Sequence, residues 1–195
     1  MSIHKWLAGG SLGVLLLVAA CDNNARDKVV ADPATPVAAD NTMQTTGEVL
    51  NTTENTAEFA TKATIGGLFE VETSKLAVER TKDAALKTFA QKMIDDHTAA
   101  NRDLKAALQA EGVAMPAETL DEDHRKKLDD LKAASAGDFD DHYVRIQKEA
   151  HASAVDLFED FIKDGPVGPL KDFATKTLTT LNAHKMEIDK ISDAR

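Results

Sequence analysis

The chain is poor in the residues that stabilise many exported proteins by covalent means or large aromatic contacts. It has one cysteine, one tryptophan and one tyrosine in 195 residues. A single cysteine excludes an intramolecular disulfide, so the fold depends on the packing of its core. Positive charge is also scarce, with 23 Lys and Arg against 33 Asp and Glu and a net charge of −10. This acidic balance argues against nucleic acid as a partner and against electrostatic adsorption to anionic lipid.

The single cysteine, Cys21, directly follows small residues at the end of an apolar run. Lys5 precedes that run, which extends over residues 12–20 and closes with Val-Ala-Ala before the cysteine. A charged start, a short apolar core and small residues before a cleavage point are typical of a secretory signal, and the run is shorter than the roughly 20 residues of a membrane helix. The position of Cys21 resembles a bacterial lipobox. Residues 1–20 are therefore predicted to be a lipoprotein signal peptide, with Cys21 as the lipidated residue.

This prediction places the protein outside the cytoplasm, as a membrane-anchored lipoprotein facing the periplasm. Asp22 follows the cysteine, and it does not decide between the inner and the outer membrane. The alternative is an ordinary signal peptide with an incidental cysteine. Cleavage would remove one basic residue, Lys5, and no acidic one, which changes the formal charge from −10 to −11. The lipid on Cys21, and not the charge of the domain, is then the expected contact with the membrane.

Residues 21–54 combine the predicted lipid site with a segment rich in Asp, Asn, Thr, Ala and Pro that has no sustained hydrophobic periodicity. Such a composition is typical of a disordered tether. A flexible chain of this length spans roughly 30 Å, which is enough to hold a folded domain clear of the lipid headgroups.

From Asn55 to the C-terminus the hydrophobic pattern is helical. We expect helices over residues 55–80, 81–112, 138–164 and 169–195, with a shorter helix starting at a Thr119-x-x-Glu122 capping box and ending before Gly137. Pro169 suits the first position of the last helix. The predicted fold is all-α, a four-helix bundle over residues 55–195 with one extra short helix. The long link from 112 to 137 is able to carry the crossover that a ferritin-like bundle requires.

Each of the last three long helices carries one histidine in the middle of its apolar stripe: His97, His151 and His184. The first helix carries Glu72 on its stripe and Glu70 on the neighbouring face. All five lie near mid-bundle when their distances from the turns are counted at 1.5 Å per residue. They form a candidate metal site, for which Zn, Fe, Cu or Ni are the suitable ions. The alternative is a polar cluster that fixes helix packing without a metal. The Glu-x-x-His repeat of diiron proteins is absent, since Ile94 and Lys148 stand three residues before two of the histidines.

Several segments resemble a known family in order and spacing. They are Gly66-Gly67-Leu68-Phe69-Glu70-Val71-Glu72, residues 89–97 with Asn101, Phe139-Asp140 with Tyr143, His151 with Phe158, and residues 171–174 with Leu178, Leu181 and His184. Together they resemble domain of unknown function 4142 over about residues 55–190. The resemblance implies a ferritin-like bacterial protein, often with a signal peptide or lipobox, and it implies no particular reaction.

The expected function is that of a cell-envelope lipoprotein whose helical domain binds a metal ion or a partner. The alternative is a structural or stress-related envelope protein with no metal and no catalysis. No nucleophile and base stand at a spacing that indicates an enzyme, and no catalytic residue is predicted.

Overall fold

The computed structural model describes the backbone of residues 42–195 and the side chains of residues 53–195. Within this range it contains helices and no strands, which confirms the predicted all-α class. The helices are α1 (Thr42–Arg80), α2 (Ala84–Glu111), α3 (Glu122–Ala133), α4 (Phe139–Asp164) and α5 (Pro169–Asp193). The predicted signal peptide, Cys21 and the tether up to residue 41 lie outside the described residues. Over the described part of the chain, no helix has the length and apolarity needed to cross a membrane.

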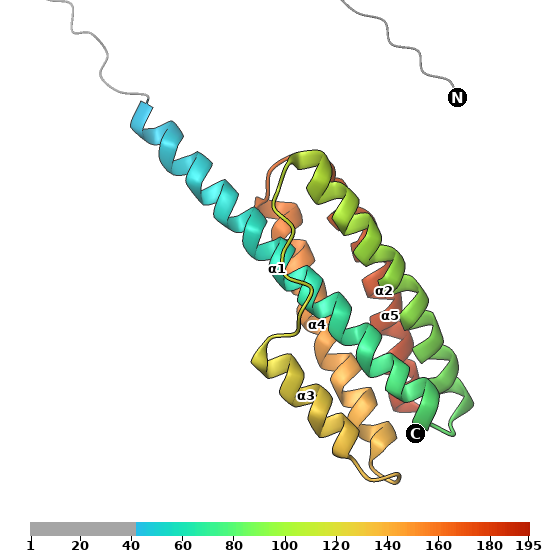
Figure 1. Ribbon diagram of the computed structural model, residues 1–195. Helices are drawn as coiled ribbons and strands as arrows, with labels where there is room; N and C mark the ends of the chain where they lie inside the picture. Colours follow the sequence, from blue (N-terminus) through green and yellow to red (C-terminus); the bar gives the residue numbers. More distant parts are fainter. Residues whose placement is uncertain (1–41) are drawn as a thin grey trace, which may run out of the picture. The chain divides into compact units, whose positions relative to one another are not determined.

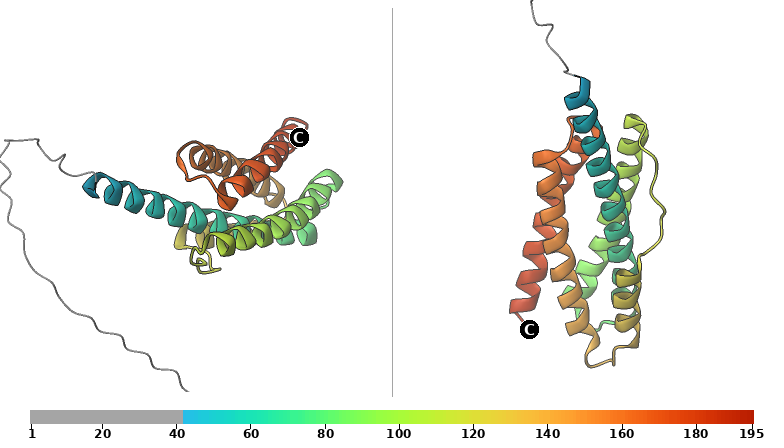
Figure 2. Two further views of the ribbon diagram at one scale, coloured as in Figure 1. Left: turned by 90° about the horizontal axis from the view of Figure 1, so that it is seen from above. Right: turned by 90° about the vertical axis from the view of Figure 1, so that its left-hand side faces the viewer.

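The four long helices form two hairpins that pack against each other (Figure 1). A short turn joins α1 to α2, and another joins α4 to α5. Across the bundle α2 packs against α5 and α1 packs against α4. The link after α2 runs back along the bundle to α3, so that α2 and α4 point the same way (Figure 2). This is the crossover expected of a ferritin-like bundle. The short helix α3 lies outside the four, against α1 and α4.

The helix ends follow local capping chemistry. Asp83 accepts hydrogen bonds from the first turn of α2, and Gly112 ends that helix in the left-handed conformation with φ 68°. Pro169 is in the first turn of α5, as predicted. The cap of α3 differs from the prediction. Asp121, and not Thr119, is the cap and accepts from the backbone N–H of His124, because the helix begins at Glu122, two residues later than predicted.

The helix α1 also starts earlier than the sequence predicts. The helix begins at Thr42, so residues 42–54 are helical and not part of an extended tether. Asn55 and Glu58, which resembled a helix start, lie inside the helix. The physical reason is that no proline follows Pro36 before this segment ends, and Gly47 is its one glycine. Nothing in the local sequence therefore stops the helix from extending toward the N-terminus.

Two hydrophobic clusters fill the interior, one on each side of the three buried histidines. The cluster toward the α1–α2 turn includes Phe69, Leu86, Phe89, Met93, Phe139, Tyr143 and Ile188. The cluster toward the α4–α5 turn includes Phe59, Leu104, Leu108, Phe158, Phe161, Phe173 and Leu181. The histidines therefore interrupt an otherwise continuous apolar core at its middle.

Candidate metal centre

Three histidines from three helices converge in the centre of the bundle. His97 comes from α2, His151 from α4 and His184 from α5, and all three side chains are buried. Their ring centroids lie 5.4 to 5.8 Å apart. One ring nitrogen of each lies within 4.8 Å of those of the other two. The sequence prediction that these three side chains meet at one level is confirmed.

The outward-facing nitrogen of each imidazole is held by an oxygen acceptor. His97 Nδ1 lies 3.0 Å from Glu70 Oε2. His151 Nδ1 lies 2.9 Å from the backbone carbonyl of Gln147 and 3.1 Å from Glu70 Oε1. His184 Nε2 lies 2.8 Å from Asp96 Oδ2. Since carbonyl and carboxylate oxygens accept, each of these nitrogens carries the hydrogen and donates it. His151 Nδ1 donates to the carbonyl of Gln147, and its contact with Glu70 Oε1 is not a hydrogen bond.

The second nitrogen of each ring has no partner. These atoms are His97 Nε2, His151 Nε2 and His184 Nδ1, and each is buried without a hydrogen bond. In the tautomers that the outer contacts select, each of these nitrogens presents a lone pair. Three acceptors cannot satisfy one another, so the cluster lacks a donor or a cation. A buried polar group without a partner destabilises the fold, which makes this a site that favours an electrophilic ligand.

Burial keeps the imidazoles of His97 and His184 neutral, which is the form that binds a metal. Removal from water lowers the pKa of His184 to about 4, an effect that His97 and His151 increase and the hydrogen bond to Asp96 opposes. Burial also lowers the pKa of His97, and Glu70 partly offsets that effect. At neutral pH the lone pairs of both rings are therefore available, and no proton has to leave before a metal ion binds.

Of the two candidate carboxylates on α1, the structure brings only Glu70 to the histidines. Its side chain is 3 % exposed and contacts both His97 and His151. Glu72 does not belong to the site, because its side chain is 47 % exposed and pairs with Lys75 at 2.7 Å on the surface. The two glutamates are two positions apart, with Val71 between them, which places them on different faces of a helix.

Two acceptors were not part of the predicted ligand set: Asp96 and the backbone carbonyl of Gln147. A carboxylate beside His97 in the sequence suggests a partner for some histidine, and the structure shows that this histidine is His184, on another helix. These contacts correspond to the outer partners that orient imidazole ligands in metal sites. The sequence cannot indicate the backbone carbonyl as an acceptor, because every residue has a carbonyl group.

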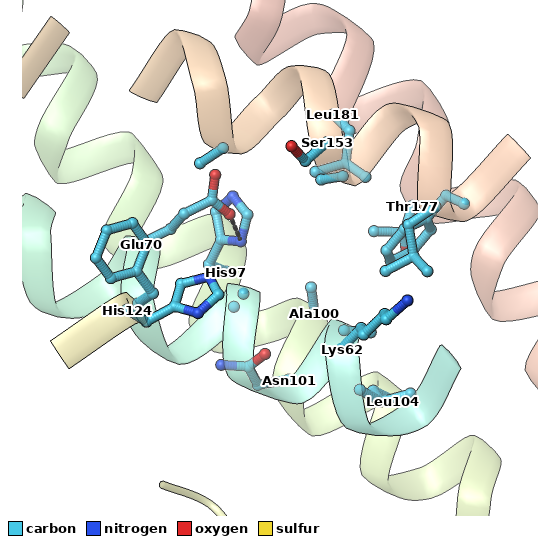
Figure 3. A pocket seen from close by; sticks show the side chains of 18 of the residues that line it. Lys62, Glu70, His97, Ala100, Asn101, Leu104, His124, Ser153, Thr177 and Leu181 are labelled. Atoms are coloured by element: carbon cyan, nitrogen blue, oxygen red, sulfur yellow. Dashed lines mark ion pairs between the residues drawn. The ribbon is translucent and has the colours of Figure 1, made fainter. Parts of the chain in front are cut away.

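A cavity of about 590 Å³ leads from the surface to one side of the cluster. It lies between α1 and α4, and Glu70 and His97 are at one end of it (Figure 3). His151 and His184 do not line it. The three-histidine cluster is thus reached from the cavity past Glu70 and His97.

The crossover and the buried three-histidine cluster define the molecule as a ferritin-like helical bundle with a candidate metal centre that differs from the diiron pattern. The family profile of Domain of unknown function (DUF4142) matches residues 41–191. The chain belongs to this family. Among curated proteins, none matches the chain.

A solved structure supports the architecture. The crystal structure of a DUF305 fragment from Deinococcus radiodurans is similar to this chain with a TM-score of 0.63 and 13 % sequence identity. The alignment covers 72 % of this chain and 97 % of the fragment. At this identity the similarity concerns the fold.

Proposed function

We propose that the domain binds one transition-metal ion through His97, His151 and His184, in a protein that a lipid on Cys21 holds at the cell envelope. The observation that carries the proposal is a cluster of three buried histidines, each of which has one ring nitrogen without a hydrogen bond. One ring nitrogen of each histidine lies within 4.8 Å of those of the other two. A water molecule has two hydrogens and leaves at least one lone pair unsatisfied. A cation accepts all three.

The geometry suits ions that prefer imidazole. Zinc binds histidine nitrogen at about 2.0–2.1 Å, which sets the nitrogens of a tetrahedral site about 3.4 Å apart. Binding would therefore draw the three rings closer together than they stand now. Imidazole ligands favour Zn, Cu, Fe or Ni over Ca or Mg. A fourth position remains for a solvent molecule or for Glu70, whose Oε1 has no hydrogen-bond partner.

Metal titration of the chain from residue 22 onward tests this proposal. The protein is stripped with a chelator and titrated with Zn, Cu, Ni and Fe, and bound metal is measured by mass spectrometry. We expect one ion per chain and a higher melting temperature, since an ion at 100 times its Kd stabilises the fold by about 2.7 kcal/mol. The variant His151→Ala should lose both effects. His142→Ala, a histidine outside the cluster, is the matched control and should retain them.

The structural alternative, a cluster that only fixes packing, predicts a different result. In that case no ion binds at stoichiometric level, and His151→Leu leaves the fold unchanged or more stable, because apolar replacement of a buried polar group is often neutral or better. Such a result would remove the metal proposal and favour a structural or interaction role in the envelope.

The proposed location rests on the sequence pattern around Cys21, which resembles a lipobox. It is tested separately from metal binding. Cells expressing the wild-type chain or Cys21→Ser are fractionated after labelling with a radioactive fatty acid. We expect label and membrane association in the wild type and neither in the variant. An unlabelled wild-type protein in the soluble fraction would contradict lipid anchoring.

A further inference from the structure

The cavity beside the histidine cluster ends on unsatisfied ligand atoms. Glu70 and His97 line it, and Glu70 Oε1 and His97 Nε2 are both buried without a hydrogen-bond partner. The two side chains are 3 % and 7 % exposed. Figure 3 shows both at the same end of the cavity, with Leu104 and Thr177 toward the other. A polar ligand that enters this space therefore meets an oxygen and a nitrogen acceptor first.

Small residues keep the cavity open. Gly66 and Gly67 on α1 and Ala150 and Ala154 on α4 all line it. At Gly67 an added Cβ would lie 2.2 Å from Asn101 Oδ1, so any side chain there would displace the asparagine amide. Because Gly67 has no side chain, the Asn101 amide can pack against α1, and the space beside it stays unfilled.

The charge of the cavity favours cations. Five carboxylates line it against two lysines, and three of those carboxylates, Glu149, Asp156 and Asp160, project from one helix, α4. All three are exposed. Clefts lined by one sign of charge focus the electrostatic field and raise the association rate of oppositely charged ligands by ten-fold or more.

A surface cavity of about 530 Å³ borders Asp96 on another side of the cluster, but none of the three histidines lines it. There Asp96 is 38 % exposed, but its Oδ2 accepts the hydrogen of His184 Nε2. A cation that approached along this side would meet the Asp96 carboxylate and, behind it, the N–H of His184 and not the lone pair of that ring. On the cavity side it meets Glu70 Oε1 and His97 Nε2, neither of which takes part in a hydrogen bond.

We infer that the cavity is the path by which a hydrated divalent transition-metal cation enters and leaves the three-histidine site, with Glu70 as its first buried ligand. This inference rests on the proposed function. Water molecules on the ion are exchanged for Glu70 Oε1 and then for the imidazole nitrogens, and they return through the cavity; no electron is transferred and no covalent bond of the protein is broken. An ion with such a path is exchangeable cargo, and the protein captures and releases metal instead of locking a permanent cofactor in its core.

Loading and release kinetics of the full chain in detergent test the path, with Zn²⁺ as the probe and a colorimetric chelator as the readout. The variant Glu149→Gln, Asp156→Asn, Asp160→Asn changes only exposed residues. We expect loading to slow about ten-fold at low salt, and the difference to disappear near 0.5 M salt, where exposed charges are screened over about 5 Å. The matched control is Glu79→Gln, Asp141→Asn, Asp193→Asn, which removes the same charge from exposed residues that do not line the cavity and should load at the wild-type rate.

A second variant narrows the cavity without changing its charge. Ser153 is an exposed residue of the cavity wall, and Ser153→Trp should slow loading and release to the same degree, at least several-fold, with Kd unchanged. Asp95→Asn, next to Asp96 on the opposite side, should change neither rate. If metal binds but both cavity variants keep wild-type rates, or if Asp95→Asn alone slows loading, the path is wrong and the proposed function stands. If no metal binds to the wild type, both fail.

Discussion

The two sides of the histidine cluster differ in how the interior of the bundle is packed. Toward the α1–α2 turn, buried polar side chains pair across helices: Tyr143 Oη lies 2.9 Å from Ser74 Oγ, and Gln147 Nε2 donates to Thr73 Oγ1 at 3.1 Å. We name this region, from the histidines to that turn, the closed half. Toward the α4–α5 turn the interior is mainly apolar, with Thr56 and Thr64 as buried polar side chains. It opens to the surface through the cavity, and we name it the open half.

The closed half holds the histidine cluster in place, and the open half gives access to it from the surface. In the closed half, the pairs between α1 and α4 fix the two helices that carry Glu70 and His151. In the open half, the same two helices present glycines and alanines and leave a space. A single pair of helices therefore holds the cluster on one side and exposes it on the other. The following predictions test this contrast, from the largest expected effect to the smallest.

The largest effect is expected from removing an aromatic ring in the closed half. Phe89 is fully buried, and its ring centroid lies 6.4 Å from those of both His151 and His184. Phe89→Ala should lower the free energy of unfolding by about 4 kcal/mol, because the cavity left behind cannot collapse. Phe173→Ala in the open half should cost about 1 kcal/mol less, since that ring already borders the cavity. Urea unfolding followed by circular dichroism measures both, and equal losses would contradict the contrast in packing.

Acid should destabilise the metal-free protein because the histidines between the two halves become protonated when the chain unfolds. The pKa of His184 is lowered from 6.5 to about 4 in the fold, so the unfolded chain binds a proton that the native state rejects. Stability is then constant above pH 6.5 and falls between pH 6.5 and 4, by roughly 3 kcal/mol for this residue. His97, whose pKa is also lowered, acts in the same direction. When the free energy of unfolding is measured across this pH range, its dependence on pH should be weaker in His184→Gln and unchanged in His142→Ala. A wild-type free energy that does not change over this range would contradict a neutral, buried His184.

The carboxylate at the boundary should affect metal affinity more than stability. Glu70→Gln should weaken binding by about 10- to 100-fold, the range for partners that orient metal-bound histidines. Glu72→Gln, which changes a neighbouring surface carboxylate, should leave the affinity unchanged. Competition with a chelator of known affinity gives both values. Equal effects of the two variants would show that Glu70 acts only through its charge.

The smallest effect distinguishes the polar pairs of the closed half from the polar wall of the open half. Tyr143→Phe should cost about 1–2 kcal/mol, because Ser74 Oγ stays buried without its partner. Adding Ser74→Ala should recover part of that loss. Thr177→Val in the cavity wall should stay within about 0.5 kcal/mol. A double-mutant cycle on the first pair measures the coupling, and an additive result would show that the hydroxyl pair contributes nothing.

The architecture and the histidines could be predicted because their signals are local or periodic. Gly112 and Pro169 mark helix ends by backbone chemistry, and one histidine per apolar stripe fixes its level in the bundle. The same periodic pattern could not predict whether Glu70 or Glu72 lies at the histidine cluster. On α1, Phe69 faces α3, where its ring packs 4.9 Å from that of His124, while small residues face the bundle interior. Phe69, the large apolar side chain nearest to Glu70 in the sequence, therefore does not mark the face that carries the site.

The remaining contacts depend on the tertiary fold. Asp96 stands beside His97 in the sequence but bonds His184 on α5, and no periodicity predicts which histidine a neighbouring carboxylate reaches. The cavity is likewise a property of helix spacing. Gly66 and Gly67 give a hint of close approach in the sequence, but the partner of that approach, Asn101, is visible only in the structure.

The three imidazoles belong to α2, α4 and α5, and so to both hairpins and both sides of the crossover. An ion held by all three would act as a reversible cross-link in a chain whose single cysteine forbids an internal disulfide. It would close the long loop that contains α3, and the metal-bound form would unfold more slowly than the metal-free form. Proteases that attack the opened chain would then remove the metal-free protein first. The amount of protein that persists would itself follow the supply of metal.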